Sequence, residues 1–275
     1  MADRAPIHLG SGEPVLLLHP FMMSQNVWKD VAPKIADTGR YEVFAPTMAG
    51  HNGGARAPFF LHSGALADDV ERQMDAIGWA TAHIVGNSLG GWVAFELERR
   101  GRARTLTGIA PAGGWSRFTA VKFEIIGKFV AGLPVWLLTR ALGPRVLQLP
   151  FSRRLAYLPI SGRAEGLSET DLVDIVDDVS HCPAYYQLLV KALLLPGLTE
   201  LADTRTPTHL VTCGKDRVLP PPRFSRKFTE QLPSIARVTH LDGVGHIPMF
   251  EAPDRITDLI LDFIDGYAGQ QRATG

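Results

Sequence analysis

The heptapeptide VGNSLGG, residues 85–91, decides how this sequence folds. It places Ser88 between glycines, after the apolar run TAHIVG (81–86) and before LGGWVAFELERRG (89–101), whose apolar residues have helical spacing. Such a strand-to-helix turn exposes the serine hydroxyl, and the flanking glycines leave no side chain to clash across it. The pattern G-x-S-x-G is weak alone, because a chain with 27 Gly matches it by chance roughly 0.1 times. Independent support must come from the rest of the chain.

Alternation of strands and helices on both sides of this motif predicts an α/β fold. A mostly parallel sheet covered by helices on both faces is expected, with strands at 14–20, 41–46, 81–86, 105–111, 208–214 and 236–242. From about residue 115 to 201 the pattern changes to helix-like segments that are rich in Leu, Val, Phe and Trp and interrupted by prolines. We therefore predict a core formed by 1–114 and 202–275, with 115–201 inserted as a helical cap over the active site.

The reactive groups are expected beyond the carboxyl ends of the strands, where open α/β sheets bind ligands. Ser88 follows one predicted strand, Asp216 in GKDRVLP follows another, and His246 in GVGHIPMFE follows a third. These residues predict a catalytic triad in which His246 takes the Ser88 proton and Asp216 orients the imidazole. Asp242 is the rival acid, and its place at a strand end favours a surface or turn role.

These motifs resemble the α/β-hydrolase family over nearly the whole chain. GNSLGG resembles the family's nucleophile elbow, GKDRVLP its acid loop and GVGHIPMFEAPD its histidine loop, while HPFMMS (19–24) occupies the place of the oxyanion loop. The resemblance implies an oxyanion hole made by the backbone N–H of Leu89 and that of Phe21 or Met22. Pro20 departs from the family, which usually has glycine there, so the second donor stays open between the two. His19 is expected to brace this loop.

Composition and spacing exclude several classes of function. Lys+Arg and Asp+Glu both number 28, so no attraction to nucleic acid is expected. No His/Asp/Glu cluster has metal-ligand spacing, no cofactor is expected, and Cys182 and Cys213 are predicted to be buried free thiols. The apolar stretch FVAGLPVWLLT (129–139) is broken by Gly and Pro and too short to span a bilayer. A cytoplasmic protein without stable membrane insertion is therefore predicted. A membrane-surface role for this stretch is an alternative, against which stands its lack of a Lys-rich face.

A serine nucleophile predicts hydrolysis of a small-molecule carboxylic ester through an acyl-enzyme. It argues against epoxide hydrolases and haloalkane dehalogenases, the relatives with an aspartate nucleophile. A carbon–carbon bond hydrolase of meta-cleavage (dienoate) products is the first alternative, favoured by Asn87 and PAGG (111–114) but not by HPFMM or Ile247. A non-catalytic ligand-binding protein is the second, and the complete triad argues against it. The sequence does not predict the oligomeric state. An apolar pocket is expected to be lined by Trp115, Phe118, Phe123, Phe129 and Trp136.

Overall fold

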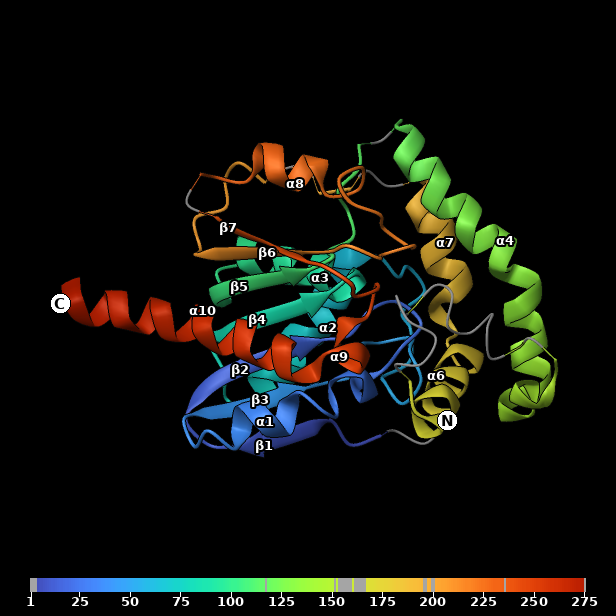
Figure 1. Cartoon of the computed structure of the whole chain (residues 1–275), viewed down its shortest axis with the longest axis horizontal. Coiled ribbons are helices and arrows are strands. Elements are labelled where there is room, and N and C mark those ends of the chain that lie inside the picture. Colours follow the sequence, from blue (N-terminus) through green and yellow to red (C-terminus); the bar gives the residue numbers. More distant parts are fainter. Residues whose placement is uncertain are drawn as a thin grey trace.

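A seven-stranded sheet forms the centre of the computed structural model, which describes residues 4–116, 118–150, 152, 160, 167–194, 197–198, 201–234 and 236–274 (Figure 1). Its spatial order is β1-β3-β2-β4-β5-β6-β7. Only the β1–β3 pair is antiparallel among the described strand pairs. The strands are β1 (Ile7–Gly10), β2 (Glu13–Leu18), β3 (Tyr41–Ala45), β4 (Ala82–Asn87), β5 (Ala103–Ile109), β6 (Thr208–Cys213) and β7 (Arg237–Leu241). This confirms the predicted mostly parallel sheet.

Helices pack on both faces of the sheet because the central strands are apolar on both sides. In β2, Leu16 and Leu18 enter one hydrophobic cluster, while Val15 and Leu17 enter the other, as the two-residue period of a strand requires. The first cluster is covered by α2 (Ser63–Ala76), α3 (Leu89–Arg99) and α8 (Arg226–Gln231). The second is covered by η1 (Gln25–Trp28), α1 (Ala32–Ala36), α9 (Pro248–Glu251) and α10 (Pro253–Thr274).

Strand β1 is the element of the sheet that the sequence did not predict. It is short and mostly exposed, and it pairs only with β3 at the edge of the sheet. The turn into β2 uses Gly12 at φ +125°, where a Cβ would lie 2.2 Å from the carbonyl oxygen of Arg40. An exposed edge strand carries no apolar run, so its sequence IHLG lacks the signal that marks the buried strands.

The segment between β5 and β6 forms helices that lie beyond the carboxyl ends of the strands (Figure 1). Within it, α4 packs against both α6 and α7, and α6 begins with a capping box between Ser168 and Asp171. The described elements are α4 (Ala120–Leu142), η2 (Gly143–Gln148), α6 (Glu169–Ser180) and α7 (Ala184–Leu194). The predicted cap, 115–201, also includes 117, 151, 153–159, 161–166, 195–196 and 199–200, which lie outside the described residues.

Helix α4 corrects one expectation about this segment. Gly and Pro were expected to break the stretch 129–139, but α4 runs through Pro134 as one helix of 23 residues. Pro134 lies on the exposed side of α4, where the carbonyl group freed by the missing N–H can bond to solvent. The argument that this stretch is too short to span a bilayer therefore fails.

Candidate active site

Ser88 occupies the turn between β4 and α3 in a backbone conformation that L-residues rarely adopt. Its φ is 54° and its ψ is −114°, a strained geometry that survives only when neighbouring structure enforces it. The Ser88 N–H donates to the Ile109 carbonyl at 3.0 Å, and the Ser88 carbonyl accepts from the Ala112 N–H at 2.9 Å. A Cβ on Gly86 would lie 2.2 Å from the Gly90 carbonyl oxygen, so the glycines of the motif are required by close backbone approach.

Asp216 and His246 come from different loops and meet at the same edge of the sheet. His246 Nδ1 lies 2.7 Å from Asp216 Oδ2, and both side chains are buried. The other carboxylate oxygen of Asp216 accepts from the backbone N–H groups of Val218 at 2.8 Å and Leu219 at 2.7 Å. Asp242, by contrast, is 91% exposed at its side chain and pairs with His240 at 3.3 Å. The geometry therefore brings Asp216, and not Asp242, to His246.

Asn87 joins the serine turn to the histidine loop. Its Nδ2 donates to the carbonyl oxygens of Ile109 at 2.9 Å and His246 at 3.1 Å. Sequence reasoning noted Asn87 only as support for a carbon–carbon bond hydrolase. In the structure its side-chain amide holds the backbone of the histidine loop against the end of β5. The one sequence signal for this role is that Asn87 directly precedes Ser88.

His19 holds the loop that runs beside Ser88. Its Nδ1 donates to the Pro20 carbonyl at 2.8 Å, and its Nε2 accepts from the Met48 N–H at 2.9 Å, which confirms the predicted bracing role. Burial is the main reason why the pKa of His19 lies well below its ordinary value, and the neighbouring His51 lowers it further. The imidazole is thus neutral, with the tautomer that both bonds need.

Phe21 and Met22, the two candidates for the predicted second oxyanion donor, differ in their surroundings. Met22 has a positive φ of 66°, and its backbone amide contributes to the hydrogen bonding around the buried Cys182 thiol. Burial raises the pKa of that thiol to about 12, so it stays protonated. Phe21 lines both cavities that reach Ser88, whereas Met22 lines only the wide one. Leu89 begins α3 directly after Ser88, where helix N–H groups point away from the helix.

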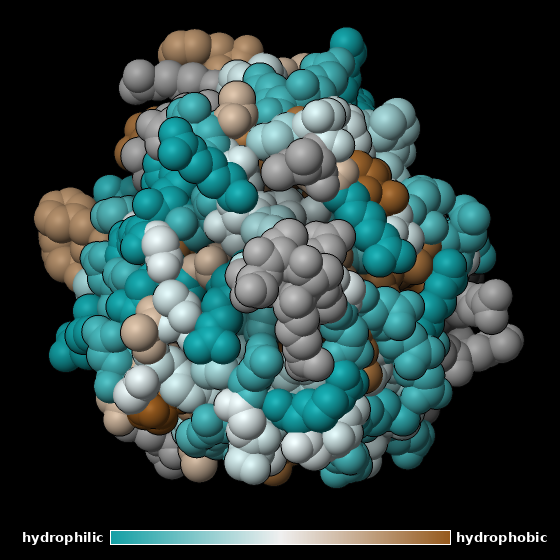
Figure 2. All heavy atoms as spheres, turned by 90° about the vertical axis from the view of Figure 1, so that its left-hand side faces the viewer, coloured by the Kyte–Doolittle hydropathy of each residue, from teal (hydrophilic) through white to brown (hydrophobic). Residues whose placement is uncertain are grey.

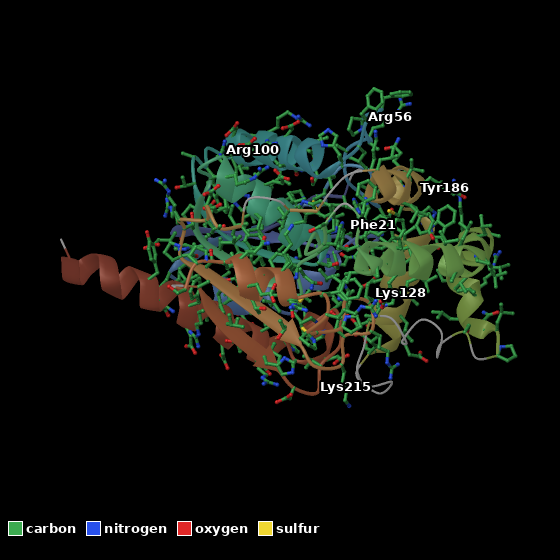
Figure 3. The ribbon with its side chains drawn as sticks, turned by 90° about the horizontal axis from the view of Figure 1, so that it is seen from above. Phe21, Arg56, Arg100, Lys128, Tyr186 and Lys215 are labelled. Carbon is green, nitrogen blue, oxygen red and sulfur yellow. The ribbon has the colours of Figure 1, made fainter. Side chains whose placement is uncertain are left out.

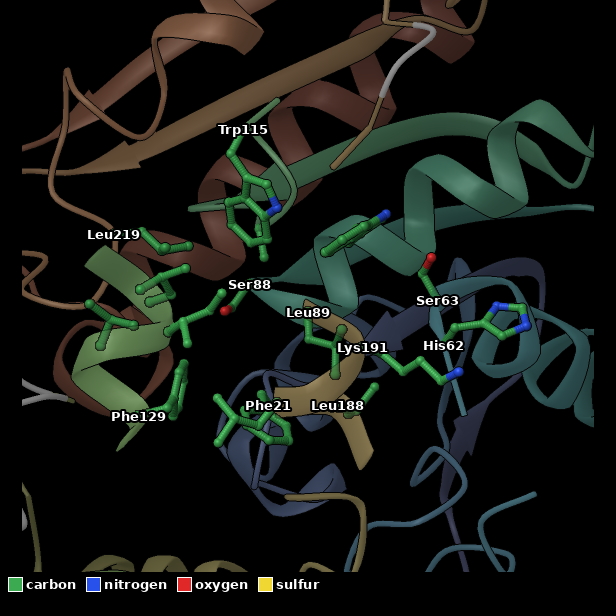
Figure 4. Close-up of a pocket in the computed structure, with 16 residues that line it drawn as sticks. Phe21, His62, Ser63, Ser88, Leu89, Trp115, Phe129, Leu188, Lys191 and Leu219 are labelled. Atoms are coloured by element: carbon green, nitrogen blue, oxygen red, sulfur yellow. The ribbon is translucent and has the colours of Figure 1, made fainter. Parts of the chain in front are cut away.

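Ser88 lies at the junction of two apolar cavities, one narrow and one wide. The narrow one has a volume of about 90 Å³ and is lined by side chains that include Trp92, Trp115, Ile125, Ile126, Leu188 and Leu219 (Figure 4). The wide one has a volume of about 590 Å³, reaches both Ser88 and His246, and is lined largely by α4, η2, α6 and α7. Phe21, Phe129 and Val218 border both cavities. The site therefore offers a small and a large apolar compartment on either side of one serine.

The five aromatic residues expected in the pocket are divided by the structure. Trp115 lines the narrow cavity, Trp136 lines the wide one, and Phe129 lines both. The expectation was wrong for Phe118 and Phe123, which line neither cavity and are 83% and 54% exposed. Phe118 precedes α4, and Phe123 lies on the outer side of its first turn.

Other groups near the site offer no metal-binding set. Within the described ranges, no group of three or more His, Cys, Asp or Glu side chains is arranged to hold a metal ion. The two cysteines, Cys182 and Cys213, are buried and unpaired, as predicted.

Comparison with known proteins places this geometry in a family. A model of the alpha/beta hydrolase family matches residues 15–259. The chain belongs to the α/β-hydrolase family. Among α/β hydrolases of known structure, it is similar to a thermophilic esterase from Thermogutta terrifontis, with a TM-score of 0.75, 21% identity and coverage of 96% of this chain and 93% of that one. It is also similar to the epoxide hydrolase CorEH, with a TM-score of 0.73, 22% identity and coverage of 95% and 94%.

One relative is much nearer in sequence. Epoxide hydrolase EphH of Mycobacterium tuberculosis (strain ATCC 25618 / H37Rv) is 63% identical over 214 residues, which cover 78% of this α/β hydrolase and 100% of EphH. The serine argued against epoxide hydrolases with an aspartate nucleophile, and a relative that carries the name epoxide hydrolase stands against that expectation. Hydrolysis by an α/β hydrolase is the conclusion that the family supports, and the bond cleaved has to be argued from the site.

Proposed function

We propose that this α/β hydrolase cleaves carboxylic esters through an acyl-enzyme formed on Ser88. The observation that carries the proposal is the 2.7 Å contact between His246 and Asp216, made where both Ser88 and His246 open onto one apolar cavity. A buried imidazole with Nδ1 bound to a carboxylate has Nε2 left to act as the base of a serine.

The proposed reaction has two balanced halves. His246 accepts the Ser88 proton as Oγ attacks the ester carbonyl, and the backbone N–H groups of Leu89 and Phe21 stabilise the oxyanion. The tetrahedral intermediate expels the alcohol, which receives the proton from His246, and leaves the acyl group on Ser88. Water, deprotonated by His246, then attacks the acyl-enzyme. The acid is released as the bond to Ser88 Oγ breaks, and His246 returns the proton to Oγ.

The sizes of the two cavities indicate which esters fit the site. The narrow cavity of about 90 Å³ has room for a few carbon atoms, whereas the wide one of about 590 Å³ has room for an extended chain or ring system. Since both meet at Ser88, the two sides of the scissile bond fit in different cavities. We infer an ester with a small apolar group on one side of the carbonyl and a much larger one on the other.

Epoxide hydrolysis is the second candidate, because EphH, which is 63% identical, carries that name. Attack of Ser88 Oγ on an epoxide carbon forms an ether, and an ether has no carbonyl through which water can release it. Turnover of an epoxide therefore requires His246 to activate water directly, together with a donor for the epoxide oxygen. Tyr185 lines the wide cavity, but its hydroxyl donates to the Phe129 carbonyl at 2.6 Å. Water activation by His246 would leave Ser88 without a role, so the proposed set of Ser88, His246 and Asp216 is better suited to esters.

Substitution of Ser88 distinguishes the two chemistries. In Ser88→Ala, kcat/KM on p-nitrophenyl esters should fall by about 10⁴-fold or more, because nucleophile and base act as one unit. Ser63→Ala is the matched control, since Ser63 lines the narrow cavity but its hydroxyl donates to Glu96. An organophosphonate should add to Ser88, seen by mass spectrometry of the peptide.

Two results would overturn the proposal. Full ester turnover in Ser88→Ala would show that no acyl-enzyme forms on Ser88. If wild type and Ser88→Ala both hydrolyse styrene oxide and neither turns over an ester, the reaction is attack on an epoxide by water that His246 activates.

A further inference from the structure

Helix α4 presents a continuous apolar stripe on its outer surface. Seven positions spaced alternately by three and four residues are all exposed, and none of them carries a charge: Ala120, Phe123, Gly127, Val130, Pro134, Leu137 and Ala141. We call these seven residues the outer stripe. Phe123, Val130 and Leu137 are 54%, 52% and 48% exposed. A helix face that meets water normally carries polar side chains at this spacing.

The buried side of α4 is not purely apolar. Lys122 and Thr139 are 1% and 5% exposed, and they share this side with the buried Ile125 and Trp136. By length and composition the helical stretch Ala120–Gln148 is apolar enough to cross a membrane. Only 22% of the residues in its most apolar window are buried in the protein. Its packing on α6 and α7 and its role in lining the active-site cavity keep it in the folded body. The exposed side of α4 is therefore free to make an apolar contact, while the helix stays packed in the protein.

Neighbouring segments extend the apolar surface beyond the outer stripe. On α7, which carries Tyr186 (Figure 3), Tyr186 and Val190 are 49% and 55% exposed. The centroids of the Tyr186 and Trp136 rings lie 5.1 Å apart. Phe118, directly before α4, is 83% exposed. The face of the molecule opposite the cap is mainly hydrophilic in the part that Figure 2 shows. Exposed apolar side chains thus gather on the cap side, and contiguous apolar patches of this kind mark interaction sites.

This surface is continuous with the active site. Val135, Leu138 and Leu149 are 45%, 44% and 41% exposed, and all three also line the wide cavity that reaches Ser88. The outer face of the cap and the wide cavity therefore share apolar side chains.

Charge identifies the partner that this face fits. Along α4 and η2 the one carboxylate, Glu124, is paired with Lys128 and Arg223, and the helices carry four basic residues, Lys122, Lys128, Arg140 and Arg145. Arg140 and Arg145 are exposed beside the apolar surface. Apolar side chains flanked by cations match a bilayer with anionic headgroups, whereas a purely apolar protein partner needs no such excess of positive charge.

We infer that the outer face of the cap docks on an anionic lipid surface and takes apolar substrate from it into the wide cavity. The docking stands on the outer stripe and the basic excess alone, and only the identity of the substrate as an ester rests on the proposed function. The cytoplasmic location predicted from the sequence would present such a surface, since the cytoplasmic leaflet is negatively charged.

Vesicle binding of the full chain tests this inference. Co-sedimentation is measured with phosphatidylcholine vesicles and with vesicles that contain 30% phosphatidylglycerol, in low and high salt. We expect wild type to bind the anionic vesicles and to be released by salt. Val130→Asp should weaken this binding at least tenfold. Val238→Asp is the matched control. Val238 is 53% exposed on the edge strand β7, outside the cap, so this variant should bind vesicles like wild type.

The outcomes separate docking from catalysis. Val130 lines neither cavity, so turnover of a soluble ester should be the same in Val130→Asp and in wild type. Failure of wild type to bind anionic vesicles, equal binding by Val130→Asp, or a dimer in solution that Val130→Asp dissociates would overturn the inference. Vesicle binding by Ser88→Ala is measured without any substrate, so it supports docking even if ester turnover is absent.

Discussion

At Asp216 the carboxylate has little freedom left to reorient. One oxygen accepts from the amides of Val218 and Leu219, and the other receives His246. Both carboxylate oxygens act as acceptors in these three bonds, so the position calls for a carboxylate and not merely for a polar side chain of the same shape. Chain proximity is a poor guide here, because Asp242 is only four residues from His246 and still points to solvent.

Asp216→Asn should therefore disable the site while Asp242→Asn leaves it intact. With the Asn oxygen held by Val218 and Leu219, the amide NH₂ faces His246 Nδ1 and imposes the tautomer that cannot accept the Ser88 proton. We expect kcat/KM on a p-nitrophenyl ester to fall about 10⁴-fold in Asp216→Asn and less than twofold in Asp242→Asn. Circular dichroism should show both variants folded. A larger loss in Asp242→Asn would reverse the assignment of the acid.

At the scale of elements, buried strands were predictable and exposed or inserted elements were less so. Strands β2 to β6 are largely buried between the two helical layers, whereas β1 and β7 are exposed edge strands. Of the two edge strands, β7 was predicted and β1 was not. The loops that carry Ser88, Asp216 and His246 followed from the strand order. In the helical segment between β5 and β6, the rotation of α4 about its axis decides which aromatic side chains face inward. Phe123 and Phe129 are six residues apart, a turn of about 240° at ~100° per residue, so one is outside when the other is inside.

The two cavities predict opposite responses to the same truncation. Ile126 lies on α4 and lines only the narrow cavity, and Ile175 lies on α6 and lines only the wide one. Removing three carbon atoms enlarges a cavity of about 90 Å³ considerably and one of about 590 Å³ very little. Ile126→Ala should therefore raise kcat/KM for esters lengthened by one or two methylenes on one side of the carbonyl, relative to the parent ester, by tenfold or more.

Ile175→Ala is the matched control for this shift in specificity. Ratios of kcat/KM are compared across an acyl series and an alcohol series, so a loss of folded protein cancels. We expect Ile175→Ala to leave the ratios within a few-fold of wild type. Equal shifts in both variants, or none in Ile126→Ala, would mean that the narrow cavity does not receive substrate.

At the scale of the whole molecule, the core depends on histidines that stay neutral. Burial lowers the pKa of His51 and of His209 to about 4, and lowers that of His19 well below its ordinary value. The unfolded chain protonates these side chains near pH 6.5, so their stabilising contribution is present above that pH and is lost as the pH falls toward 4. Asp178 acts in the opposite direction. Burial raises its pKa to about 6, so its protonation favours the folded state as the pH falls.

His209→Gln isolates one such contribution far from the serine. His209 is fully buried on β6, and its Nε2 lies 2.8 Å from the Thr239 hydroxyl, a bond that an amide side chain can replace. With a pKa of about 4 folded and 6.5 unfolded, this histidine costs about 2 kcal/mol of stability between pH 7 and pH 5. Urea unfolding should therefore show the free energy of unfolding falling less from pH 7 to pH 5 in His209→Gln than in wild type, whatever the variant loses at pH 7. Asp178 and the other histidines are common to both proteins and cancel in that difference. An equal fall in the two proteins would show that His209 is protonated to the same degree in the folded and unfolded states.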